Sequence, residues 1–489
     1  MTIEKISYCI LLSKTFILRM KKSRLVNIFR TLTKKEIRDL RKWLHSPAHN
    51  QREDTVRLFE YLVREGNLQN EEMLDKSTIF PYVLPAEQGY DDAKMRQVMF
   101  FLLRSTEDFL VYEEFKSQST EQNLLLTRAL GKRKINSYFP KAVKNSLETL
   151  HKKKLRDKDF YRYNYEIKYE NYEYQSKINR LGNFNLQEIS DSFDIYYISL
   201  KLKQSCIMAS HQKVFKTEYD IGLLEEILNY VQSQKLYEVP AIGMYYFGYK
   251  SIVGSDGDAS FRSLKQILQE NEVSFLKTEL GEIYLIAINY CIGKMNAGET
   301  EFIREAFELY KRGFESKILL TDGGISLYAF VNVTSIARSI KEYTWAENFI
   351  ENYNQYLAKG YRQTTVLYCL AQLEYDKGNF EKAEKLFIRV EHPDILLNLS
   401  AKTFLLKMYY EAEELSVLES LLGSMRTYLR RKNFVGYHKQ NYKNIIKYTK
   451  KLVRVNPYSR ADKTKLKNEV EQVSPLTERK WILAQLAKM

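Results

Sequence analysis

Residues 367–387 read LYCLAQLEYDKGNFEKAEKLF, and this stretch decides the fold of the chain. Its apolar residues recur three or four positions apart on both sides of Gly378, which is the spacing of two amphipathic helices joined by a turn. Ala371 and Ala383 are small enough to let the two helices approach closely, and Phe387 fills the space toward the next pair. The stretch therefore predicts a helical hairpin.

The order of these residues resembles the tetratricopeptide (TPR) repeat, in which a leucine and a small residue precede the turn and an alanine and an aromatic residue follow it. Weaker copies flank the best one: Ala346 stands 37 residues before Ala383, and Leu418 stands 35 residues after it. Leu418 departs from the small residue of the pattern, and Glu374 departs from the usual aromatic residue. Three copies are enough for a stable solenoid.

Taken whole, the chain from Met20 onward resembles a family of uncharacterised bacterial TPR-like proteins of the α-solenoid type. The resemblance implies an architecture and no activity. It rests on three blocks: LTKKEIRDLRKWLHSP at 32–47, YYEAEELSVLESLLGSMRTYLRR at 409–431 and NPYSRADKTKLKNEVEQVSPLTERKWIL at 456–483.

Helical periodicity over nearly the whole chain predicts an all-α fold of stacked antiparallel hairpins with an N-terminal helical module. Two further hairpins are expected from 239–253 with 258–270 and from 280–294 with 299–312. We expect Met20 to be the true start of the protein, because a well-patterned helical module begins there. The expected organisation is a mis-assigned or frayed extension at 1–19, the N-terminal module at 20–135, irregular hairpins at 136–325, degenerate TPR-like repeats at 326–430 and basic capping helices at 431–489.

Composition limits the class of protein. At 489 residues the chain is too long for one compact domain, and 19 glycines with 8 prolines are too few for a sandwich or barrel. The four cysteines are far apart, which indicates a reduced compartment, so we expect a cytoplasmic protein. The apolar run at 6–18 is interrupted by Lys14 and is too short to span a bilayer.

The sequence predicts no enzyme, no cofactor and no metal site. It contains no glycine-rich phosphate loop, no GxSxG and no HExxH. His45 and His49 have the four-residue spacing of metal ligands on a helix, but Pro47 breaks that helix between them. Asp256-Gly257-Asp258 opens like a calcium loop, but the glycine and the closing glutamate of that loop are missing.

The repeat register predicts a concave wall made by the first helix of each hairpin, and hence a scaffold that binds another protein or peptide. The alternative for the same positions is a solvated helix face. The predicted wall residues are Val331, Ser335, Arg338, Tyr368, Gln372, Tyr375, Thr403, Lys407 and Tyr410.

Positive charge is concentrated at two ends of a chain whose net charge is +15. Residues 1–45 hold 12 Lys or Arg against 3 Asp or Glu, and residues 426–467 hold 14 against 1. An amphipathic helix at 436–455 would cap the last repeat and carry five cations on its outer side, which suggests nucleic-acid or other polyanion binding as the alternative function. The other interpretation is a solvated cap. The cations are Lys439, Lys443, Lys447, Lys450 and Arg454.

Overall fold

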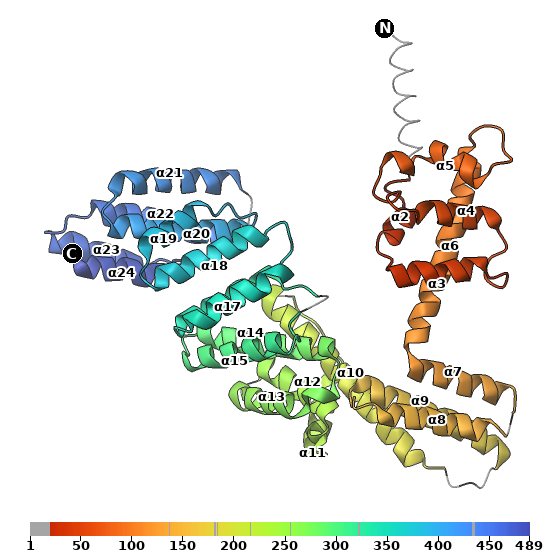
Figure 1. Cartoon of the computed structure of the whole chain (residues 1–489). Helices are drawn as coiled ribbons and strands as arrows, with labels where there is room; N and C mark the ends of the chain where they lie inside the picture. Colours follow the sequence, from red (N-terminus) through yellow and green to blue (C-terminus); the bar gives the residue numbers. More distant parts are fainter. Residues whose placement is uncertain are drawn as a thin grey trace. The chain divides into compact units, whose positions relative to one another are not determined.

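The computed structural model describes residues 20–135, 137–179, 182, 184–215, 217–254, 256–320, 323–432 and 436–489 (Figure 1). All regular elements in these ranges are helices, so the prediction of an all-α fold is confirmed. The extension predicted at 1–19 lies outside the described residues.

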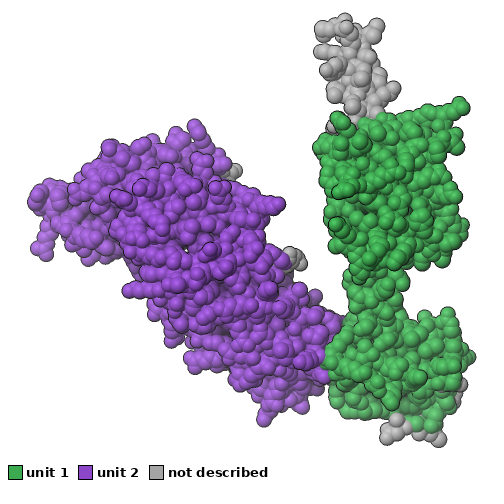
Figure 2. Space-filling view, in the orientation of Figure 1, with its two compact units in different colours: residues 1–153, 162–192 green, residues 154–161, 193–489 purple. Residues whose placement is uncertain are grey.

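Two compact units divide the chain (Figure 2). One holds the residues up to Lys153 together with Arg162–Ser192, and the other holds Lys154–Tyr161 together with Phe193–Met489. The first unit therefore extends past the predicted boundary at 135/136. Two helices, α9 (Lys158–Ile178) and α10 (Leu186–Phe215), have residues in both units.

Local sequence signals set the helix ends of the first unit. Thr33 and Glu36 form a capping box at the start of α3, and Asp91 caps α6 by accepting from two backbone N–H groups. The buried side chains of α2 to α6 form one apolar core. The helices are α2 (Arg24–Phe29), α3 (Lys34–His45), α4 (Glu53–Leu62), α5 (Lys76–Val83), α6 (Asp92–Ser117), α7 (Ser119–Lys132) and α8 (Phe139–Lys152), with the 3-10 helix η1 (Glu72–Leu74).

The second unit consists mainly of successive helix pairs, and both hairpins predicted between 239 and 312 are present as α12 with α13 and α14 with α15. Its helices are α11 (Leu224–Ser233), α12 (Pro240–Val253), α13 (Gly257–Asn271), α14 (Lys277–Asn296), α15 (Glu301–Glu315), α16 (Leu327–Ser339), α17 (Tyr343–Tyr353), α18 (Arg362–Asp376), α19 (Phe380–Ile388), α20 (Ile395–Glu411), α21 (Leu415–Arg431), α22 (Gly436–Arg454), α23 (Arg460–Gln472) and α24 (Arg479–Lys488). Its 3-10 helices are η2 (Leu236–Glu238), η3 (Glu272–Ser274) and η4 (Asn354–Tyr356).

The same turn joins the two helices of four successive hairpins, from α14–α15 to α20–α21. One residue of each turn has a positive φ, between 59° and 98°, and the N–H of the next residue donates to the carbonyl five positions before it at 2.9–3.1 Å. This is the Schellman arrangement that ends a helix. Three of these residues are spaced by 37 and 35 positions, as the sequence repeats are. They are Gly298, Lys341, Gly378 and Glu413.

The register of the repeats is also visible in the core. Ala346, Ala371, Ala383 and Leu418 are completely buried, so the predicted close-approach positions lie where the helices pack. One continuous apolar core runs from Ile198 to Leu486, and the predicted boundaries at 325/326 and 430/431 do not interrupt it. Among the helices within the described ranges, none has the length and apolar character that crossing a bilayer requires.

Helix α22 packs as the sequence predicted. Its side chains Ile445, Ile446 and Leu452 are buried, and Tyr442 is partly buried with its hydroxyl 3.4 Å from the carbonyl oxygen of Leu396 in α20. The amphipathic helix therefore continues the stack beyond α21 through its apolar face.

Candidate partner-binding surfaces

The nine predicted wall residues do not line an open groove. Of these nine, Ser335 is exposed, and Tyr375, Lys407 and Tyr410 are partly buried. The prediction of a solvent-facing wall at these positions is therefore wrong, because most of the side chains are enclosed. The buried ones are Val331, Arg338, Tyr368, Gln372 and Thr403.

A polar ladder explains part of this burial. Arg338 in α16 donates from Nε to Asp376 at 2.8 Å and from Nη1 to Oε1 of Gln372 at 2.7 Å. Gln372 donates to the hydroxyl of Tyr368 at 2.9 Å, and that hydroxyl is 2.8 Å from Oγ of Ser400. The ladder links α16, α18 and α20, the first helices of three hairpins. It satisfies buried polar groups that would otherwise destabilise the core.

The C-terminal segment covers the last part of the predicted wall. Lys407 of α20 forms an ion pair with Glu478 at 2.6 Å, and the ring of Tyr410 lies 5.4 Å from that of Trp481. Trp481 also donates its indole N–H to Glu411 at 2.7 Å. The repeat register gave no information about the C-terminal segment that packs against α20 at these positions.

A different surface of the repeats is open. A cavity of about 330 Å³ lies between α19, the end of α20 and the turn that follows. Met408, Tyr409 and Ala412 give it apolar and aromatic surface, and the ring of Phe380 at its edge is 51% exposed. Four glutamates also line the cavity, beside this apolar floor of Met408, Tyr409 and Ala412. We call this the acidic pocket, lined by Phe380, Glu381, Glu384, Met408, Tyr409, Glu411, Ala412 and Glu414.

The pocket has a negative field. Burial, followed by the Glu384 carboxylate and then that of Glu414, raises the pKa of the Tyr409 hydroxyl to about 12. Glu411 also accepts from Trp481 and Gln485. A signal in the sequence did exist: Glu381 and Glu384 follow Phe380 in one helix, and Glu411, Glu413 and Glu414 gather at the next turn. The sequence does not show that these two clusters line the same pocket, because that depends on how α19 and α20 pack.

The five predicted cations of α22 share its outer side. Lys443, Lys447 and Arg454 are exposed, and Lys439 and Lys450 are partly exposed. None of the five forms a salt bridge within the described part of the chain. We call this set the basic stripe.

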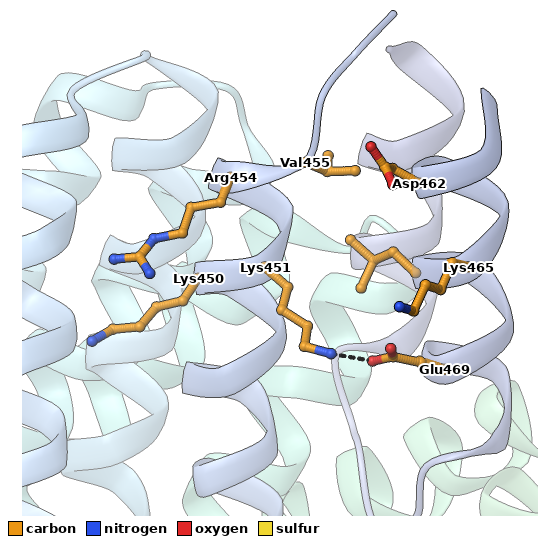
Figure 3. A pocket seen from close by; sticks show the side chains of 8 residues that line it. Lys450, Lys451, Arg454, Val455, Asp462, Lys465 and Glu469 are labelled. Atoms are coloured by element: carbon orange, nitrogen blue, oxygen red, sulfur yellow. Dashed lines mark hydrogen bonds and ion pairs between the residues drawn. The ribbon is translucent and has the colours of Figure 1, made fainter. Parts of the chain in front are cut away.

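A basic cleft adjoins the stripe. Lys450, Lys451, Arg454 and Lys465 line a cavity of about 270 Å³ between α22 and α23, together with Asp462 and Glu469. In Figure 3 the side chains of Lys450 and Arg454 extend to the same side of α22, and Lys451 points to its ion-pair partner Glu469. The cations of α22 therefore differ in role, because Lys451 is neutralised within the fold and Lys450 and Arg454 are not.

One buried cluster carries titratable groups. Tyr245 donates its hydroxyl to Glu279, and both side chains are buried. Burial raises the pKa of the Glu279 carboxyl and that of the Asp157 carboxyl. Asp157 is also buried, and its Oδ1 accepts from the backbone N–H of Phe160. Such shifts occur in active sites and in structural cores alike. Here the groups are enclosed and hydrogen-bonded to one another or to the backbone, as in a structural core.

The two histidines considered as metal ligands have separate partners. The ring of His49 stacks on Trp43 with centroids 3.6 Å apart, and Nε2 of His45 lies 3.9 Å from Glu60. Among the described residues, no group of three or more His, Cys, Asp or Glu side chains is arranged to hold a metal ion.

The acidic pocket and the basic stripe are the two surfaces of the second unit that could hold a partner. The TPR-like resemblance remains one of sequence pattern, and the repeat type stays a prediction. No protein-family model and no curated protein match the chain.

Proposed function

We propose that this chain is a non-catalytic helical-repeat scaffold that binds another protein or a peptide, and that the acidic pocket receives the bound segment. The observation that carries the proposal is an apolar floor surrounded by four carboxylates. A cavity of about 330 Å³ has room for one or two side chains rather than a folded element. The complementary ligand is an extended segment with an aromatic or aliphatic anchor next to Lys or Arg.

The electrostatic part can be tested on two exposed carboxylates of the rim. We expect replacement of Glu381 and Glu414 by lysine to weaken binding of a basic peptide at least about tenfold, because two attractive charges become repulsive. The probe is a fluorescent peptide with one phenylalanine flanked by lysines, and its affinity is measured by fluorescence anisotropy. Two further peptides, with alanine for the phenylalanine or glutamate for the lysines, should bind more weakly to the unmodified protein.

The matched control replaces Glu391 and Glu419 by lysine. Both are exposed glutamates outside the pocket lining. It makes the same change of net charge, so it should lower the peptide affinity much less. Equal losses in the two double variants would mean that the peptide responds to total charge and not to the pocket. Failure of the phenylalanine–lysine peptide to bind the unmodified protein would reject the proposed ligand class.

The second candidate function is binding of nucleic acid or another polyanion through the basic stripe. Its supporting observation is that five cations on one side of α22 have no salt-bridge partner among the described residues. Ion pairs with phosphates would release counterions and make the affinity depend steeply on salt. The competing interpretation of the stripe is a solvated cap of the helical stack.

These interpretations separate in a salt titration with a fluorescent DNA duplex. If the stripe contacts phosphates, changing Lys443, Lys447 and Lys450 to glutamine should reduce the slope of log affinity against log salt by about 2–3 units. The control changes three exposed lysines of other helices and loops to glutamine: Lys141, Lys152 and Lys359. An unchanged slope in the stripe variant, or no binding of DNA by the unmodified protein at low salt, would exclude this function.

A further inference from the structure

The basic stripe is a straight row of cations along one helix. Its five side chains recur every three or four positions of α22 and fall within about 80° on a helical projection. With a rise of about 1.5 Å per residue, the row is about 22 Å long, and neighbouring cations are about 4.5–6 Å apart along the helix axis. The stripe therefore presents about one positive charge per helical turn in a single line.

The row is not interrupted by a carboxylate of its own helix, because α22 contains no Asp or Glu. Two carboxylates of α23, Asp462 and Glu469, line the cleft that adjoins the stripe. Glu469 is paired with Lys451, and Figure 3 shows Lys450 and Arg454 extending to the other side of α22. The electrostatic complement of the stripe is therefore a linear chain of negative charges.

The straightness of the row decides which form of nucleic acid fits it. The backbone of a single strand can run along a straight surface, so that each cation meets a phosphate in turn. A strand of a B-form duplex turns by about 36° per base pair, so that five consecutive phosphates wind through about 140°. A duplex therefore leaves the row after about three contacts, and the cations at its two ends, Lys439 and Arg454, are not used.

An exposed aromatic ring follows the last cation of the row. Tyr458 lies in the loop between α22 and α23, four residues after Arg454, and it is 95% exposed. The bases of a single strand are free to stack on such a ring, whereas the bases of a duplex are enclosed in their own stack. The ring is therefore a second feature that suits a single strand better than a duplex.

From the row and the ring we infer that the basic stripe binds single-stranded nucleic acid, with consecutive phosphates on its five cations and a base on Tyr458. The inference rests on the second candidate function and narrows it from polyanions in general to one form of nucleic acid. The acidic pocket is lined by other residues and takes no part in this contact.

The first test compares a fluorescent oligothymidine with a DNA duplex of the same length by fluorescence anisotropy of the full chain. At equal low salt the single strand should bind at least about tenfold tighter, because it meets five cations rather than about three. In the double variant Lys439→Gln with Arg454→Gln, the slope of log affinity against log salt for oligothymidine should fall by about 1.4 units, since each contact with a single strand contributes about 0.7. The slope for the duplex should stay unchanged.

The matched control changes Lys141 and Lys152 of α8 to glutamine, which removes the same net charge at two exposed positions outside the stripe. Both slopes should then keep their unmodified values. Equal affinity for the two probes, or equal losses of slope for both in the end variant, would overturn the inference and leave the second candidate function in place. Absence of binding to either probe would reject that function itself, and the inference with it. Circular dichroism of each variant checks that the helices remain folded.

The second test removes the ring. Tyr458→Ala should weaken the binding of oligothymidine at least about fivefold, because a base loses its stacking partner, and the salt slope should stay the same, because no cation is removed. The affinity for the duplex should not change. Tyr138→Ala is the control, since Tyr138 at the start of α8 is 64% exposed and lies outside the stripe. Unaltered binding of oligothymidine by Tyr458→Ala would overturn the assignment of a base to this ring.

Discussion

Replacing Phe349 by alanine is expected to lower the free energy of unfolding by about 3–5 kcal/mol, because a fully packed aromatic side chain is removed from a core that cannot collapse around the space. Phe349 in α17 is 2% exposed. Its ring centroid lies 5.0 Å from that of Phe314 in α15, 5.1 Å from that of Phe330 in α16 and 4.8 Å from that of Tyr353. The substitution therefore removes contacts that hold two neighbouring hairpins together.

Urea denaturation followed by circular dichroism measures this loss. Phe380→Ala is the matched control, since its ring is 51% exposed and the same atoms are removed. We expect the control to shift the unfolding midpoint by a small fraction of the shift in Phe349→Ala. If the two variants unfold at the same urea concentration, the aromatic cluster does not contribute to the stability of the stack.

Much of the fold could be predicted because its signals are local. The periodicity and small residues of 367–387 predicted a hairpin, and Ala371 and Ala383 are buried between its helices. Lys341 and Glu413 adopt the positive φ that Gly378 adopts, although neither is a glycine. Tertiary packing of the hairpins therefore imposes the turn even where the residue itself disfavours it.

The location of the open surface could not be predicted because it depends on contacts between distant residues. Glu411 accepts hydrogen bonds from Trp481 and Gln485, which lie 70 and 74 positions away, and no local pattern specifies that pairing. The acidic pocket likewise combines one helix with the end of another.

The Arg338 ladder provides the second large effect. We expect Arg338→Met to destabilise the protein by about 3–5 kcal/mol. Removing the guanidinium takes away the donor of the Asp376 carboxylate and of Oε1 of Gln372. Arg338 is 8% exposed and bonds to both Asp376 and Gln372. Gln372 is buried as well, so its Oε1 would lose its donor in a place that water does not easily reach. Asp376 is partly solvated, which places the expected loss near the lower end of that range.

Two comparisons separate this role from that of a groove residue. Ser335→Ala lies one turn earlier on the same helix at an exposed position, and it should change the free energy of unfolding by less than about 0.5 kcal/mol. Arg338→Lys keeps the charge but not the two-pronged geometry, so it should recover part of the stability and not all of it. A solvent-facing arginine would give values near zero for Arg338→Met and for Arg338→Lys alike. A loss in Arg338→Met of the same size as in Ser335→Ala would therefore mean that α16 and α18 are not joined by this ladder in solution.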